Sequence, residues 1–567
     1  MVLAMLEWYW IPPEFSAIVY VYYEELSACV MVNGEQTRWF RFQRGVFQGC
    51  TLSTMLFDTA FNTVFERIAP LTEEYGFEFL HVGLKKLITG YADDIAILTE
   101  LASDNQLVLD LVHEWLEWTE TMKAKPKKCL ATALASGRPV DPKLFIDGNA
   151  INWIAHEPFK FLGRQTRANA SNDAAKQQLL DMFDKHTNTI DGLALTPSQK
   201  IWIVDAVLMS IISWNLLIHD LPVSFVKSLG AKQNQLYKKW SGVAKFTVTS
   251  VFYRTPKNHG WNLKEMVPFF QKQQLIRCHL LKTSSDPDVR QLYQETHRQE
   301  RENRQSLDPV KRGAWRPTIE LADCLEAVEH KKRAGKANAG TQGLGLIAPA
   351  KKSLSQSVQA EERQAVLEEF AEKIEGGRYQ HCLKLAQWAE WTKWDDVMEQ
   401  DRDWQKIIMQ RNDELWKFEL GALEDTLPTP SILKHWYGKD NGGLDGKCKV
   451  CNAAQGSLKH ILAGCKVALN QGRYTWRHDS VLFRIYQTVR SLRDQGREKF
   501  HNHTPNVQDV TTFVSHSLLE GETEHQNTET AGCQLPPIVM NEIPIFVNGD
   551  QEKAPLRCVH TTEFSPV

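Results

Sequence analysis

Two stretches in the first fifth of the chain have the apolar and polar pattern of β-hairpins. Apolar and polar residues alternate on both sides of Asn33-Gly34, a dipeptide typical of two-residue hairpin turns. A second stretch, Leu87–Glu100, has two apolar runs around a turn that contains Asp93 and Asp94. The pattern therefore predicts two antiparallel hairpins, one of which carries adjacent carboxylates at its turn.

Most of the remaining chain has the apolar spacing of helices. Residues 1–30 predict two helices that are separated by a break at Pro12-Pro13, and residues 140–165 alternate and predict a small β segment. The residues expected to pack in helical cores are Leu107, Leu111, Val112, Trp115 and Trp118, then Leu179, Leu180, Met182 and Phe183, then Ile201–Leu217, and finally Trp388, Trp391, Trp394 and Trp404.

Composition limits the class of protein. The 567 residues are 43% hydrophobic and 24% charged, which is enough to bury the cores of two or three domains. The net charge of −3 gives no general sign of nucleic-acid binding, and eleven scattered cysteines indicate reduced thiols with one metal site rather than disulfides. No apolar run predicts a membrane span, and the apolar start lacks the basic region of a signal peptide. We therefore expect a nuclear or cytoplasmic protein that is not secreted and binds no membrane.

The turn with Asp93 and Asp94 suits divalent metal ions. Phosphoryl transfer uses two ions about 3.5–4 Å apart, and neighbouring acids on a rigid hairpin can hold them. The sequence YADD alone is weak and also fits a solvated turn. Its surroundings are more specific, because GVFQGCTLSTMLF (Gly45–Phe57) precedes it, and KPKKC (Lys125–Cys129) and FKFLG (Phe159–Gly163) follow it.

This ordered set resembles the reverse transcriptases of LINE-type (non-LTR) retrotransposons, except that Thr54 stands where the family has proline. The resemblance implies RNA-directed DNA synthesis by two-metal catalysis, with an RNA template and a DNA primer as partners. The residues with an implied role are the Mg²⁺ ligands Asp93 and Asp94, the phosphate-contacting Lys128, the template and nucleotide contacts Gly45, Gln48, Gly49, Ser53 and Tyr91, and the primer grip Phe161, Leu162 and Gly163.

The resemblance also indicates a missing catalytic group. Family members carry a third catalytic aspartate on a strand just before a helix like Met1–Trp10, and Asp58 is the only aspartate before Asp93. We expect Asp58 to lie on a helix surface. The glutamates before the turn lie in no predicted strand that faces it; they are Glu7, Glu14, Glu24, Glu25, Glu35, Glu66, Glu73, Glu74 and Glu78.

Loss of one catalytic group costs on the order of 10²–10⁴-fold in rate or more. We therefore expect an inactive polymerase, unless an upstream segment, a partner chain or one of these glutamates supplies the ligand. The alternative is a non-catalytic RNA- or DNA-binding remnant.

A basic segment follows, with eleven Lys/Arg residues and the single acid Glu265 between Lys227 and Lys282. Basic side chains interleaved with aromatic ones suit a phosphate backbone with stacked bases. A basic surface over buried aromatic residues would have the same sequence, but we expect nucleic-acid contact. The aromatic residues are Tyr237, Trp240, Phe246, Phe252, Tyr253 and Trp261.

The second chemical site is Cys448-x2-Cys451-x8-His460-x4-Cys465. Three thiolates and one imidazole complete the tetrahedral coordination of Zn²⁺ and leave no open position, so we expect a structural zinc ion. Together with LPTPSILKHW before it and GRYTWRHDSVL after it, the site resembles the zinc knuckle of retrotransposons of the restriction-like-endonuclease class. The nuclease of that class has no counterpart here, because the one Pro-Asp pair, Pro287-Asp288, lies far upstream.

The fold class predicted is α+β, a partial right-hand polymerase palm followed by a mostly helical thumb and linker and a small zinc knuckle, truncated at both ends. The predicted segments are a palm over 1–165, a basic helical thumb over 166–300, a flexible linker over 301–359 that includes a basic triplet at Lys331-Lys332-Arg333, a helical region over 360–440, the CCHC zinc knuckle over 441–490 and a disordered tail over 491–567.

Overall fold

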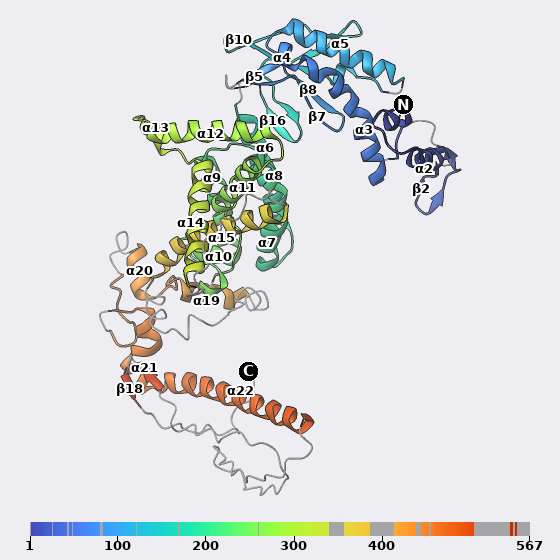
Figure 1. Ribbon diagram of the computed structural model, residues 1–567. Helices are drawn as coiled ribbons and strands as arrows, with labels where there is room; N and C mark the ends of the chain where they lie inside the picture. The colour runs from blue at the N-terminus through green and yellow to red at the C-terminus, as the bar shows by residue number, and fades with distance from the viewer. Residues whose placement is uncertain are drawn as a thin grey trace. The chain divides into compact units, whose positions relative to one another are not determined.

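The computed structural model describes residues 2–24, 26–41, 45–47, 49–79, 83–120, 122–167, 171–258, 260–338, 356–385, 413–437, 444–452, 455–503, 545–547 and 550–552 (Figure 1). The chain forms two compact units. The first unit consists of Met1–Leu236 with Leu263–Gly376, and the second of Tyr237–Asn262 with Gly377–Val567.

The first unit begins with the predicted helices and hairpin. Helices α1 (Val2–Trp8) and α2 (Pro13–Glu24) are separated at Pro12-Pro13, as expected. Strands β2 (Met31–Val32) and β3 (Glu35–Gln36) pair antiparallel, and β1 (Ser27–Ala28) pairs with β4 (Phe40–Arg41). Asn33 and Gly34 have φ angles of 52° and 88°. Both values lie in the left-handed region that a type I′ turn requires, so the hairpin prediction is confirmed.

The hairpin that carries the acids lies on a helical core. Strands β7 (Ile88–Tyr91) and β8 (Asp94–Ile97) pair antiparallel, and α3 (Thr51–Ile68) and α5 (Ala102–Trp118) contact them. The rings of Phe61 and Trp115 meet edge to face with centroids 5.5 Å apart. The buried residues of this core are Met5, Ala60, Phe61, Val64, Ile68, Leu87, Val108, Val112, Trp115 and Leu116.

The predicted core positions of α5 are only partly right. Val112 and Trp115 are buried, whereas Leu107 is 41% and Trp118 59% exposed. Val108 takes the place expected for Leu107, because the buried face follows the spacing 108, 112, 115 and 116 of a regular helix.

Short two-stranded pairs complete the part of the first unit that precedes the helical region. They are β5 (Phe77–Phe79) with β6 (Leu84–Lys86), β9 (Leu130–Ala131) with β14 (Asn152–Trp153), β10 (Ala133–Ala135) with β11 (Arg138–Val140), β12 (Phe145–Ile146) with β13 (Asn149–Ala150), and β15 (Phe159–Phe161) with β16 (Arg164–Thr166). Between them lie η1 (Ala69–Leu71), α4 (Thr72–Tyr75) and η2 (Pro126–Lys128). The β segment predicted over 140–165 is confirmed.

Helices form the rest of the first unit. They are α6 (Asp173–Gly192), α7 (Pro197–Ile203), the π-helix η3 (Val204–Leu208), α8 (Met209–Ile218), α9 (Val223–Ser241, whose end belongs to the second unit), α11 (Met266–Lys282), α12 (Pro287–Gln305), α13 (Pro309–Gly313), α14 (Pro317–Asn338) and α15 (Gln356–Cys382). Among the predicted core residues, Leu179, Phe183, Ile201 and Leu216 are fully buried.

One helical stretch differs from the expectation about membrane spans. Pro197–Ile218 is long and apolar enough to cross a membrane by length and composition, although 39% of its most apolar window is buried in the protein. It is the only such helix in the part of the chain that the structure describes.

The flexible linker predicted over 301–359 is wrong for its first half. Residues 317–338 form α14, and Leu321 and Cys324 pack with Leu275, Val366 and other residues of α11 and α15. The apolar spacing 321, 324 and 328 is helical, and it outweighs the polar composition from which a linker was predicted. Residues 339–355 lie outside the described residues.

The second unit contains α10 (Ser250–Tyr253), η4 (Pro256–Asn258), α19 (Asp413–Leu423), α20 (Pro430–Tyr437), η5 (His460–Gly464), α21 (Lys466–Asn470), α22 (Arg473–His503) and the strand pair β17 (Ile545–Val547) with β18 (Asp550–Glu552). The start of the predicted disordered tail is therefore helical to His503. Trp388, Trp391, Trp394 and Trp404 lie outside the described residues.

Candidate nucleic-acid interface and metal centre

The two adjacent acids lie at the tip of the β7–β8 hairpin. Tyr91 pairs with Asp94, so Ala92 and Asp93 form the two-residue turn. Ala92 has a φ of 53°, which is unusual for a residue with a Cβ atom and typical of strained turns at functional sites. Asp93 and Asp94 are exposed, as is Tyr91. The hairpin therefore presents both carboxylates to solvent.

The acids do not form a complete metal site. Among the described residues, the only group of three or more His, Cys, Asp or Glu side chains close enough to hold one ion is a set of three cysteines and His460. Asp58 is exposed on α3, as the sequence predicts. Two carboxylates are fewer than the ligand set of a two-ion phosphoryl-transfer site, so the described residues do not fit the Mg²⁺ pair.

Two of the predicted template and nucleotide contacts, Gly45 and Gly49, lie in the loop before α3, and Ser53 lies in the first turn of that helix. Gly45 and Gly49 have φ angles of 89° and 94°, and a Cβ atom at either position would meet no atom within 4 Å. Their open surroundings leave space for a close approach by a ligand. Ser53 is instead buried, and its hydroxyl lies 2.7 Å from that of Tyr23. Gln48 lies outside the described residues.

The thiol of Cys50 at the N-terminus of α3 is more acidic than usual. Its pKa is lowered by the backbone N–H and the hydroxyl of Ser53, and then by the backbone N–H of Leu52 and the hydroxyl of Tyr22. Free N–H groups at the start of a helix favour negative charge. Sequence reasoning had given Cys50 no role.

Lys128 is exposed at the end of η2. Its backbone N–H donates to the carbonyl oxygen of Lys125 at 2.8 Å. No hydrogen bond or ion pair within the described residues joins Lys128 to Asp93 or Asp94, so its predicted role near the phosphates stays a prediction.

The predicted primer grip is a tight hairpin that packs against α8. Leu162 and Gly163 join β15 to β16 with φ angles of 46° and 82°, as in a type I′ turn. A Cβ atom on Gly163 would lie 2.7 Å from Nε1 of Trp214 in α8, so only glycine fits there. Lys160 and Arg164 on the two strands are exposed, as is Leu162 at the tip. We call Lys160, Leu162, Arg164 and Trp214 the grip surface.

Large apolar side chains extend from the grip surface along α8, η3 and α7. Trp202, Val207, Ile211 and Trp214 are 54%, 43%, 43% and 51% exposed. The spacing of five residues between Trp202 and Val207 crosses the π-helix, in which each turn holds more residues, so both can lie on one face. The sequence expectation treated Ile201–Leu217 as core and missed this exposed stripe. The sequence feature that could have revealed this stripe is the pair Trp202 and Trp214, which lie on the helix side opposite the buried residues.

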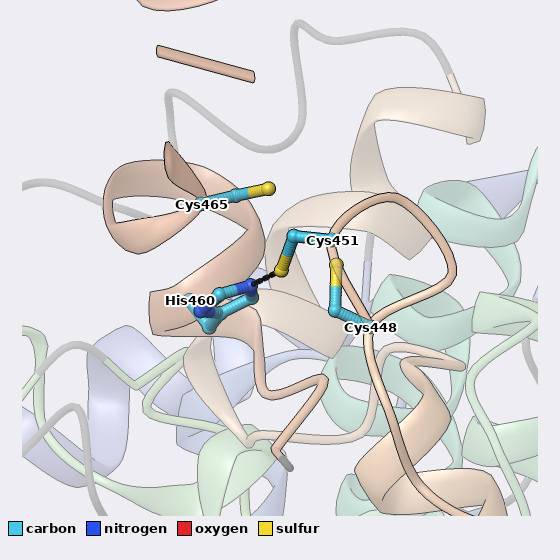
Figure 2. Close-up of side chains that lie close together, drawn as sticks. All are labelled: Cys448, Cys451, His460 and Cys465. Carbon is cyan, nitrogen blue, oxygen red and sulfur yellow. Dashed lines mark hydrogen bonds between the residues drawn. The ribbon is translucent and has the colours of Figure 1, made fainter. Parts of the chain in front are cut away.

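Three cysteines and one histidine meet in the second unit. Figure 2 shows Cys448 and Cys451 on one loop and His460 and Cys465 at the two ends of η5, with their side chains turned toward one another. Their ligand atoms all lie within 4.8 Å of one another, and Cys451 Sγ is 3.1 Å from His460 Nε2. Sulfur atoms on one zinc ion are separated by about 3.8 Å at Zn–S distances of about 2.3 Å, so the four groups need move little to coordinate it.

Local hydrogen bonds favour the thiolate form that zinc requires. The backbone N–H groups of Cys451 and Val450 lower the pKa of Cys448 to about 6. Tyr474 supports the other half of the set, because its hydroxyl accepts from the backbone N–H of Cys465 at 3.2 Å and donates to the carbonyl of Ile461 at 2.8 Å. The four residues thus fit a closed, structural zinc ion, as the sequence predicts.

Comparison with known families identifies the part of the chain that carries the acids. Residues 9–166 match the family model described as Reverse transcriptase (RNA-dependent DNA polymerase). This segment is therefore similar to a reverse transcriptase domain, and we call it by that name below. No curated protein matches the chain.

The reverse transcriptase domain contains every residue to which the resemblance assigns a polymerase role. The match begins just after α1 and ends with β16 at Thr166, so it includes the acid hairpin, the loop before α3 and the primer-grip turn. The three cysteines and His460 lie outside it. The short motifs and the family match therefore indicate the same part of the chain.

The basic segment beyond the reverse transcriptase domain differs from its predicted role. Tyr237, Trp240, Phe252, Tyr253 and Trp261 are at most 8% exposed, so bases cannot stack on them. Phe246 is exposed but packs on Trp436, with ring centroids 5.0 Å apart. These aromatic residues are core, and the stacking expectation for them is wrong.

Acidic residues from other elements neutralise about half of the basic segment. Because the acids come from distant parts of the sequence, a count within the segment could not reveal them. The ion pairs are Lys232 with Asp184, Arg254 with Glu424, Lys264 with Asp205, Arg277 with Asp220, and Lys282 with Glu362.

Proposed function

We propose that this chain derives from the reverse transcriptase of a LINE-type retrotransposon and binds RNA or DNA without extending a primer by itself. The match of residues 9–166 supports the polymerase ancestry. The order of the YADD, KPKKC and FKFLG blocks supports the LINE-type branch, and the set Cys448, Cys451, His460 and Cys465 supports the restriction-like-endonuclease class within it.

One observation carries the proposed lack of activity. Asp93 and Asp94 are exposed at a hairpin turn, yet no third carboxylate joins them within the described residues. Polymerisation needs the primer hydroxyl and the α-phosphate to be aligned and their charge to be neutralised. With two carboxylates alone, the described residues supply an incomplete site for that alignment.

The grip surface supports the proposed binding. Lys160 and Arg164 are exposed on either side of Leu162, and Trp214 is half exposed beside the turn. Cations attract phosphates, while apolar and aromatic side chains contact sugars and bases. Because Lys160 pairs with Gln165 and Arg164 with Phe161, the two cations lie on opposite faces of the hairpin. This arrangement suits a nucleic-acid strand that passes around the tip of the hairpin.

Primer extension tests the proposed lack of polymerase activity. The full chain and its Asp93→Ala variant are incubated with an RNA template, a DNA primer, dNTPs and Mg²⁺. We expect no extension by either protein and equal RNA binding by both. Mg²⁺-dependent extension that is lost in Asp93→Ala would overturn the proposal and favour an enzyme that obtains its third ligand elsewhere.

Salt dependence tests the grip surface. Substitution of Lys160 and Arg164 by glutamine should weaken RNA binding and lower the slope of log K against log salt by about 1 for each phosphate that the variant no longer binds. The control is Arg138→Gln, which changes an exposed arginine on the β10–β11 hairpin. Equal slopes for all three proteins would place the nucleic acid elsewhere.

A further inference from the structure

A separate cavity lies within the helical part of the first unit. Its volume is about 800 Å³, which is the size of a small-molecule site. Helices α11 and α12 form two of its walls, and the segments that lead into α9 and α14 form the others. Most of its surface is apolar, with Phe270, Leu292 and Trp315 among the lining side chains.

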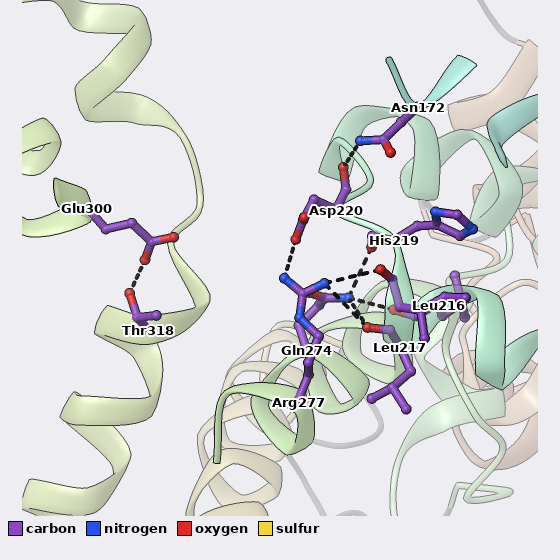
Figure 3. A network of polar contacts seen from close by, with 10 residues as sticks. Asn172, Leu216, Leu217, His219, Asp220, Gln274, Arg277, Glu300 and Thr318 are labelled. Carbon is purple, nitrogen blue, oxygen red and sulfur yellow. Dashed lines mark hydrogen bonds and ion pairs between the residues drawn. The ribbon is translucent and has the colours of Figure 1, made fainter. Parts of the chain in front are cut away.

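One polar wall is fixed by the end of α8. Arg277 pairs with the carboxylate of Asp220, and Gln274 donates to the carbonyl oxygens of Leu216 and His219 at 2.6 and 3.2 Å (Figure 3). Asn172 helps to position Asp220, because its side-chain amide donates to the backbone carbonyl of Asp220 at 2.8 Å. The positive charge of Arg277 is therefore neutralised inside the wall.

The opposite polar wall belongs to α12 and α14. Glu300 accepts a hydrogen bond from the hydroxyl of Thr318, and Figure 3 shows this pair across from Arg277 and Asp220. Burial raises the pKa of Glu300, while the positive charge of Arg316 acts in the opposite direction. This wall thus offers a hydrogen-bond acceptor, the Glu300 carboxyl, with the opposite charge of Arg316 near it.

Three hydrogen-bond donors among the lining residues are buried without a partner in the described part of the chain. Trp315 Nε1, Arg277 Nε and Arg316 Nε are buried and have no acceptor within the described part of the chain. A buried donor without an acceptor destabilises the folded chain, so a ligand that brings acceptors gains from each donor it reaches after a small side-chain rotation.

We infer that this cavity binds an unpaired nucleobase of a bound RNA or DNA strand. A base has the flat apolar faces that the lining of Phe270, Leu292 and Trp315 requires, and its edge carries ring nitrogens and carbonyls that can accept from Trp315 and the arginines. It is uncharged, which suits a cavity in which Asp220 already pairs with Arg277 and the charge of Arg316 acts on Glu300. A ligand with its own charge would lose hydration without gaining a free counter-charge. Base binding would also give this cavity a role in the proposed nucleic-acid binding.

Free nucleosides test the cavity without relying on strand binding. Adenosine, guanosine and uridine are titrated into the full chain and followed by saturation-transfer NMR. We expect at least one to bind, Leu292→Trp to abolish its binding by filling the cavity, and Trp315→Phe to weaken it about 3- to 10-fold through loss of one donor. Leu307→Trp is the matched control, because Leu307 is 94% exposed and outside the cavity.

Several outcomes would overturn the inference. These are no binding by any nucleoside, binding that Leu292→Trp leaves unchanged, or tighter binding of decanoate or inorganic phosphate than of every nucleoside. A thermal melt checks that each variant folds, and Val289→Trp provides a second filling variant in the same wall. The inference rests on the proposed nucleic-acid binding, but the two can fail separately. Loss of RNA binding with nucleoside binding intact would reject only the proposed function.

Discussion

At the scale of single residues, Gly163 links the turn between β15 and β16 to helix α8. Its φ of 82° and the 2.7 Å approach of Trp214 Nε1 to a Cβ atom are two separate reasons for glycine. Gly137 provides the matched control, since its φ is 75° in the turn between β10 and β11 but a Cβ atom there would meet nothing within 4 Å.

We therefore expect Gly163→Ala to lower the free energy of unfolding by about 1–3 kcal/mol more than Gly137→Ala does. Both variants place alanine in the left-handed region, but only the first also creates a clash. Urea denaturation of the full chain measures the difference. Equal losses would mean that Trp214 moves away freely and does not fix the turn.

Glu300 gives the chain a predictable dependence on pH. Burial raises its pKa in the folded state above the ordinary value of 4.5, Arg316 and Arg277 oppose this shift, and Asp220 adds to it. The folded state thus holds the proton more tightly than the unfolded chain does, so the stability from this group is complete below pH 4.5 and is lost as the pH rises through the raised pKa.

Glu300→Gln should remove this loss while keeping an acceptor for Thr318. The variant should gain stability relative to the natural chain as the pH is raised from 4 toward 8, with the smallest difference at the acid end. Denaturation curves at a series of pH values measure it. A difference that does not vary with pH would show that Glu300 is as easily ionised in the folded chain as in the unfolded one.

At the scale of elements, the loop that includes α10 is held to the helical part of the second unit by a buried ion pair. Arg254 and Glu424 are both fully buried, and their side chains form an ion pair. Arg254 also donates to the sulfur of Cys382 at 2.7 Å. Burial raises the pKa of Glu424 and Arg254 lowers it, so the charge of Glu424 depends on its partner.

Arg254→Met should destabilise the chain by about 3–5 kcal/mol, because it leaves the Glu424 carboxylate buried without a counter-charge. The double variant Arg254→Met with Glu424→Met should recover much of that loss. Arg333→Met is the control for removal of a cation from an exposed pair, because the side chains of Arg333 and Glu329 are 70% and 66% exposed; its expected cost is under about 1 kcal/mol. If the double variant were as unstable as the single one, the ion pair would not be the cause.

The sequence predicts elements better than it predicts their partners. The Asn33-Gly34 turn, the acid hairpin and the Cys/His set are local patterns, and each forms where its spacing indicates. The free positive charge of the basic segment is reduced by Glu424 and other acids far away in sequence. The local count of Lys and Arg therefore overestimated the charge that is available to nucleic acid. Helix α14 was missed for a related reason, because a polar average concealed a narrow apolar face that packs on α11 and α15.

At the scale of the whole molecule, the reverse transcriptase domain and the Cys/His centre belong to different units. The domain match ends at residue 166, whereas Cys448, Cys451, His460 and Cys465 lie in the second unit. The core of each is built from its own residues, since the acid hairpin rests on α3 and α5, and the Cys/His set packs with Ala468 and Tyr474. Damage to one centre should therefore leave the fold of the other intact.

Removal of zinc tests this independence. The purified chain should contain one zinc ion per molecule by elemental analysis. Cys465→Ser should lose it, while Cys29→Ser, which changes a cysteine in the other unit, should keep it.

After chelation, hydrogen exchange should rise over residues 444–474, because coordination rather than a large apolar core fixes that segment. Exchange over α3 and α5 should stay unchanged, since their core contains no metal ligand. A protein without zinc as purified would refute the structural centre, and a parallel rise in α3 and α5 would show that the reverse transcriptase domain depends on it.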